Sequence, residues 1–149
     1  MDTMKKPVTW ILIADGSRAK IFEAAGQGKI LQKSELSTPH PPSRDLVSDR
    51  PGRTFDSTGT GRHAKQPPSD PHDKAESDFL RSIVKQLEES QQKNEFDRLV
   101  VVAAPRALGT LRGFFPETLS SSVAQEIAHD LTWFETPAIE SYLKEHEVI

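Results

Sequence analysis

A chain of 149 residues that is 35% hydrophobic can bury a core without disulfides or metals, so we expect one globular domain over residues 1–149. The sequence contains no cysteine, which excludes disulfides, cysteine-ligated zinc, iron–sulfur clusters and thiol nucleophiles, and its apolar runs are too short to cross a membrane. We therefore expect a cytoplasmic protein without a membrane partner, and the net charge of −3 argues against nonspecific binding to duplex nucleic acid.

The first part of the chain is typical of a three-stranded antiparallel meander. Residues 8–14 are rich in β-branched and aromatic side chains and end at the turn pair Asp15-Gly16. Residues 19–24 form the second predicted strand. Residues 29–36 follow a Gly-Gln-Gly turn, and the alternation of their side chains predicts a third strand.

A long proline-rich loop follows, at about residues 37–73. Seven of the eleven prolines of the chain lie between positions 39 and 71, and proline lacks the backbone donor that a helix interior or a sheet requires. Most connections in compact domains run about 4 to 6 residues, so a loop of this length indicates either a function or disorder. Between residues 44 and 65 it carries five basic and three acidic side chains, a small excess that favours phosphate.

The firmest local prediction is a helix over about residues 71–92. Asp70 provides an N-cap carboxylate directly before Pro71, which suits the first helical position. The apolar residues that follow at helical spacing are Phe79, Leu80, Ile83, Val84 and Leu87.

The second half of the chain alternates strands and helices. Residues 99–104 are continuously apolar, the pattern of a parallel strand covered on both faces. Short helices are predicted at 106–112 and 116–121, a fifth strand at 122–131, and a last helix after Thr136-Pro137. The order predicts an α/β fold of RNase H-like type, with a mixed five-stranded sheet and helices on both faces.

The glycine- and arginine-rich stretch 49–63 is the main predicted binding site. Glycines let backbone amides approach a ligand closely, and arginine forks suit phosphate or carboxylate. The residues of this site are Arg50, Arg53, Thr54, Phe55, Gly59, Gly61, Arg62 and His63. The alternative is a surface arm whose arginines pair with Asp45, Asp49 and Asp56, and Phe55 either pins that arm to the domain or stacks on a base.

A secondary anion site is predicted where the strand order of such a sheet reverses, at residues 15–18 and 104–109. Its residues are Asp15, Ser17, Arg18 and Arg106. The alternatives are a tight turn in which the Asp15 side chain bonds local backbone amides, and a plain strand-to-helix connection in which Gly109 allows close packing.

Metal, cofactor and catalytic sites are not predicted. His40, His63 and His72 lie near Asp70 and Asp73, but their spacing matches no local ligand motif. Nothing in the sequence fixes Ser57 and His63 with an aspartate as a hydrolytic triad. A two-metal nuclease needs several carboxylates at the central strands, and only Asp15 qualifies.

Several pieces of the chain together resemble the bacterial host-attachment protein family. They are residues 10–20 (WILIADGSRAK), 49–56 (DRPGRTFD), 61–64 (GRHA), 100–105 (VVVAAP), 108–109 (LG) and 130–132 (DLT). That family resembles in turn the middle domain of archaeal and eukaryotic peptide-chain release factors, which implies an RNase H-like core and a ribosomal partner. In those factors a Gly-Gly-Gln tip occupies the loop position held here by residues 59–63, and this chain contains no such tripeptide.

We expect from these observations a non-catalytic, translation-associated factor that contacts ribosomal RNA or tRNA through the 49–63 stretch. One alternative is a protein-interaction factor needed for attachment to host cells. A second alternative is a hydrolase that acts on peptidyl-tRNA through a nonstandard loop residue.

Overall fold

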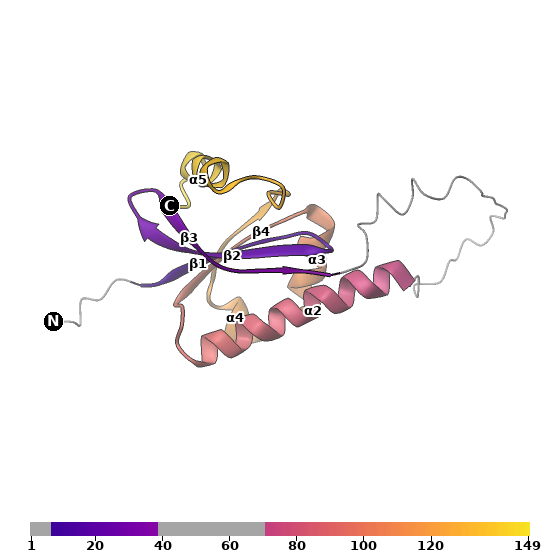
Figure 1. Cartoon of the computed structure of the whole chain (residues 1–149). Coiled ribbons are helices and arrows are strands. Elements are labelled where there is room, and N and C mark those ends of the chain that lie inside the picture. The colour runs from indigo at the N-terminus through magenta and orange to yellow at the C-terminus, as the bar shows by residue number, and fades with distance from the viewer. Residues whose placement is uncertain (1–6, 39–70) are drawn as a thin grey trace.

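Five strands form one sheet in the order β3-β2-β1-β4-β5. The computed structural model describes residues 7–38 and 71–149 (Figure 1). The strands are β1 Thr9–Ala14, β2 Arg18–Gly26, β3 Lys29–Ser37, β4 Arg98–Ala103 and β5 Val123–Ala128. Strand β2 pairs antiparallel with β1 and β3, whereas β1 pairs parallel with β4 and β4 with β5. The mixed five-stranded sheet predicted from the sequence is therefore confirmed.

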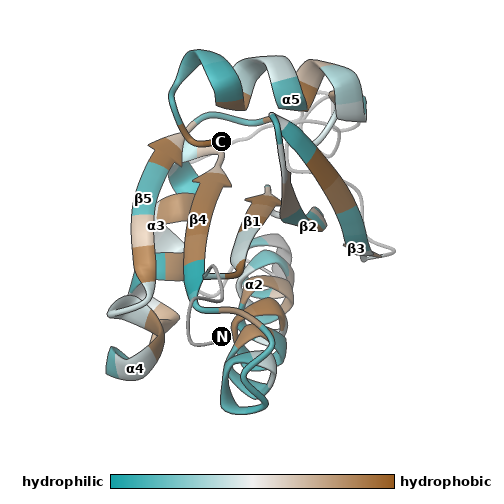
Figure 2. Ribbon diagram, turned by 90° about the vertical axis from the view of Figure 1, so that its left-hand side faces the viewer, coloured by the Kyte–Doolittle hydropathy of each residue, from teal (hydrophilic) through white to brown (hydrophobic). Residues whose placement is uncertain are grey.

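Helices cover both faces of this sheet. They are α2 Pro71–Gln92, α3 Pro105–Phe114, α4 Glu117–Ser120 and α5 Thr136–Glu145. Helices α2, α3 and α4 contribute to one core and α5 to the other, and Figure 2 shows α5 and α2 on opposite sides of the sheet. The α2 bounds match the predicted helix over 71–92.

The two cores explain why β1 and β4 are apolar at every position after the first. Successive side chains of a strand point to opposite faces, so Leu12 packs on the α2 side and Ile13 on the α5 side. In the same way Val101 of β4 faces α2, and Val102 faces α5. A parallel strand buried on both faces has no solvent side that would require polar residues.

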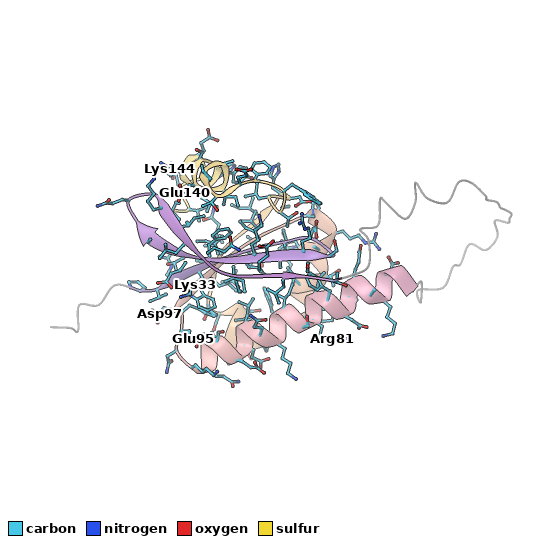
Figure 3. All side chains as sticks on the ribbon, viewed as in Figure 1. Lys33, Arg81, Glu95, Asp97, Glu140 and Lys144 are labelled. Atoms are coloured by element: carbon cyan, nitrogen blue, oxygen red, sulfur yellow. The ribbon has the colours of Figure 1, made fainter. Side chains whose placement is uncertain are left out.

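The hairpin of β2 and β3 is held by its own turn and by the last helix. Gly26, Gln27 and Gly28 all have positive φ, which confirms the predicted Gly-Gln-Gly turn. Glu140 of α5 accepts a hydrogen bond from the backbone amide of Ile30 at 3.0 Å. Figure 3 labels Glu140 and Lys144 on α5, at this end of the sheet.

The fifth strand is shorter than the sequence predicts. The alternating pattern predicted a strand over 122–131, and this is wrong beyond Ala128, where β5 ends. Leu131 continues the apolar period but is fully buried in the α5-side core, and Phe134 donates its amide to the Leu131 carbonyl at 3.0 Å. The prediction was too long because Leu131, a buried loop residue, has the spacing expected of the next strand residue.

Replacing Leu87 with alanine should lower the free energy of unfolding by about 2–5 kcal/mol, because the side chain is fully buried between α2 and the sheet. Leu31 on β3 is 60% exposed, so Leu31→Ala is the matched control and should change that free energy by less than about 0.5 kcal/mol. Urea unfolding of both variants measures the difference. Equal losses would contradict the docking of α2 described here.

Candidate functional site

The main predicted site lies outside the described residues. This holds for Arg50, Arg53, Thr54, Phe55, Gly59, Gly61, Arg62 and His63, which all belong to segment 39–70. The structure does describe the residues on either side of that segment. It also describes the four residues of the secondary site.

Both flanks of segment 39–70 lie at the β1–β2 turn (residues 15–17). On the β3 side, Ser37 is the strand partner of Arg18, and the Thr38 amide donates to the Ser17 carbonyl at 3.0 Å. On the α2 side, the Glu76 carboxylate approaches Gly16 so closely that a Cβ there would lie 2.6 Å from its carbon. The end of β3 and the first part of α2 therefore lie beside the same turn, at one end of the sheet (Figure 1).

The β1–β2 turn is built around the Asp15 carboxylate. Asp15 Oδ1 accepts hydrogen bonds from the backbone amides of Ser17 and Arg18, each at 2.8 Å. The Asp15 amide donates to the Arg18 carbonyl at 2.9 Å. The interpretation of this turn as one whose side chain bonds local amides is confirmed. The two amides that an external anion would use are occupied by the chain's own carboxylate.

A second set of contacts ties this turn to the loop before α5. The Thr132 hydroxyl lies 3.2 Å from Asp15 Oδ2 and 2.5 Å from Asp130 Oδ1, and the Thr132 amide donates to Asp130 Oδ1 at 2.9 Å. A hydroxyl has one proton, so it donates to one of the two carboxylates at a time. Asp15 and Thr132 are both buried, at 8% and 1% exposure. Two segments distant in sequence are thus joined through polar groups that water hardly reaches.

Arg18 and Trp133 form a cation–π pair beside these contacts. The Arg18 guanidinium carbon lies 3.9 Å from the centre of a Trp133 ring, the geometry of a cation–π contact. Trp133 is 55% exposed. Thr132 and Trp133 were not predicted from the sequence as members of this site. The available signal was a large aromatic residue in a short loop between a strand and a helix.

Arg106 lies apart from the other residues of the secondary site. It begins α3 on the α2 side of the sheet, and its guanidinium forms an ion pair with Asp73 in the first turn of α2. Arg18 instead contacts Trp133, next to residues of the α5-side core. The structure therefore brings together Asp15, Ser17 and Arg18 and leaves Arg106 in a separate contact between two helices.

Two further features of the described residues bear on the kind of site. Within residues 7–38 and 71–149, no three histidine or carboxylate side chains are grouped as they would be around a metal ion. None of the helices in that part of the chain combines the length and the apolar character that crossing a bilayer requires.

Asp15→Ala should lower the free energy of unfolding by about 1–3 kcal/mol, because two backbone amides lose their acceptor in a buried turn. Asp78→Ala is the control: this carboxylate is half exposed and pairs with Lys74 and Arg81 of its own helix. Removing such a surface pair should change that free energy by less than about 0.5 kcal/mol. Equal effects in denaturant titrations would show that the Asp15 contacts carry no more weight than a surface pair.

Residues 10–143 match the family described as "Protein required for attachment to host cells". No curated protein matches the sequence. Among solved structures, the chain is similar to an archaeal translation termination factor, aRF1, with 12% identity and a TM-score of 0.54 over 95% of this chain and 35% of that one. It is also similar to a structure described as an archaeal protein, with 13% identity and a TM-score of 0.53 over 95% of this chain and 34% of that one.

The chain spans about a third of the length of these two solved structures. At such identities the likeness shows the fold, which is the RNase H-like α/β arrangement that the strand order indicates. The family match covers most of the chain, from β1 into α5. This protein therefore belongs to the family of proteins required for attachment to host cells.

Proposed function

We propose that this protein is a non-catalytic, translation-associated factor of the cytoplasm that contacts ribosomal RNA or tRNA through residues 49–63. The observation that carries the proposal is the position of both flanks of segment 39–70 at the β1–β2 turn. Binding residues are commonly held on loops that a rigid scaffold positions. Here that scaffold is the buried sheet.

The composition of the segment supports an anionic partner. Between residues 44 and 65 the chain has five basic and three acidic side chains, although its net charge is −3. Arginine suits phosphate because its planar fork donates two parallel hydrogen bonds. The fold shared with an archaeal translation termination factor makes the ribosome the first partner to test.

The family description supports a second candidate function. A protein required for attachment to host cells could act through a protein partner, and Leu31 and Trp133 are large apolar side chains that are more than half exposed. Exposed aromatic residues are frequent anchors of protein interfaces. Digestion with ribonuclease separates the two candidates, because it abolishes an interaction that depends on RNA and leaves one with a protein.

The combined variant Arg50→Ala, Arg53→Ala, Arg62→Ala should lose about tenfold or more of the RNA captured with tagged protein from a lysate, because it removes three cations from the proposed contact. The matched control is Lys85→Ala, Lys93→Ala, Arg98→Ala. It removes the same charge from exposed positions on α2, just beyond it and at the start of β4.

Equal losses in both variants would show that only net charge matters. Unchanged capture of RNA in the first variant would overturn the role of residues 49–63. Capture of a protein partner that survives ribonuclease treatment, with no RNA recovered, would favour the attachment factor instead.

Purified protein should release no peptide from peptidyl-tRNA on ribosomes, because the Gly-Gly-Gln tip of the release factors that it resembles is absent. Release of labelled peptide measures this, with a factor that contains the tip as the positive control. Release above the rate without any factor would favour the hydrolase that uses a nonstandard loop residue.

A further inference from the structure

Trp133 is held on the surface by burial of the residues before it. Leu131 is fully buried in the α5-side core, and Thr132 is 1% exposed beside Asp15. Trp133 follows them directly and is 55% exposed, whereas the other tryptophan, Trp10, is 6% exposed in the core. Anchoring on one side and exposure on the other give a large aromatic ring a fixed place on the surface.

Arg18 differs from three other arginines of the described chain. Arg81, Arg106 and Arg112 each form an ion pair with a carboxylate. Within residues 7–38 and 71–149, the Arg18 guanidinium has no carboxylate partner and contacts the Trp133 ring. A guanidinium stacked on a ring keeps its N–H donors in its own plane, where they can bind an anion.

The two members of the pair are positioned by the same carboxylate. Asp15 accepts the backbone amide of Arg18 through one oxygen and contacts the Thr132 hydroxyl through the other. Trp133 is the next residue after Thr132, so Asp15 bonds the backbone of one member of the pair and the side chain of the residue before the other. A pair ordered in this way loses less conformational entropy when it binds a ligand.

From this arrangement we infer that Arg18 and Trp133 bind an unpaired nucleotide of RNA, with the base stacked on the indole and a phosphate accepting from the guanidinium. This inference rests on the proposed function and names the form of RNA that the protein contacts. Stacking requires an exposed base face, which single strands and loops offer and a duplex hides. With a net charge of −3, the protein lacks the broad positive field that duplex backbone binding uses.

The pair also lies beside the end of β3, from which the chain continues into segment 39–70. Arg18 is the strand partner of Ser37, directly before the segment that contains residues 49–63. A single strand bound by the pair would therefore lie next to the point where the chain leaves β3. A nucleotide carries both a base and a phosphate, which matches an aromatic ring and a cation better than an uncharged apolar peptide does.

The test uses the intrinsic fluorescence of the full chain. Trp10→Phe leaves Trp133 as the one tryptophan, so quenching in this background reports directly on the proposed contact. The probes are oligouridylate alone and the same strand in duplex with oligoadenylate. We expect quenching by the single strand and at least about fivefold weaker binding of the duplex.

Binding of labelled oligouridylate to variants completes the test. Trp133→Ala should weaken binding at least about fivefold, and Trp133→Phe should retain most of it because phenylalanine also stacks. Arg18→Lys keeps the charge and loses the planar fork, so it should bind more weakly than the parent and better than Arg18→Ala. Leu31→Ala is the control, because it removes another exposed apolar side chain, which lies on β3.

The outcomes separate this inference from the proposed function. If the parent protein captures RNA from the lysate but Trp133→Ala binds oligouridylate as well as the parent, the inference is overturned and the function stands. Equal binding of single strand and duplex also overturns it. If the parent binds no RNA in either assay, both proposals fail. If the parent then captures a protein from the lysate despite ribonuclease treatment, and Trp133→Ala abolishes that capture, the pair belongs to a protein interface.

Discussion

The carboxylate of Asp15 joins two segments of the chain that are far apart in sequence. One of its oxygens accepts two amides of the β1–β2 turn, and the other contacts the Thr132 hydroxyl. Because the group is 8% exposed, water competes little with these contacts, and each hydrogen bond counts for more than it would on the surface. The turn beside segment 39–70 and the Arg18–Trp133 pair both depend on this one side chain.

The direction of β1 places the Asp15 carboxylate on the α5 side of the sheet. Ile11 and Ile13 point to the α5 side, so Asp15 continues on the same side just beyond the end of β1. The parallel pairing of β1 with β4 brings the ends of both strands to one edge, next to the start of α3. That edge is where a fold of this kind places binding groups, although the fold itself does not specify what is bound.

The sequence predicted in part which residues lie close together around Asp15. The sequence indicated residues 15–18 and the start of α3 as neighbours, and the parallel pairing confirms that β1 and β4 end together. It could not indicate that Arg106 turns to Asp73 on one side of the sheet while Arg18 meets Trp133 on the other. The side of a sheet on which a loop side chain lies depends on the helices that cover each face. A local sequence pattern does not contain this information.

The types and order of the helices and strands followed from local sequence patterns, because the apolar residues of helices and strands repeat with different periods. These patterns placed α2 and the parallel strand β4 correctly, and they extended β5 into Leu131 because a buried loop residue kept the strand period. The partners of Asp15 and Arg18 depend instead on how distant segments pack in three dimensions. The contact between Asp15 and Thr132 spans 117 positions, and such a contact exists only after the sheet and α5 have packed together.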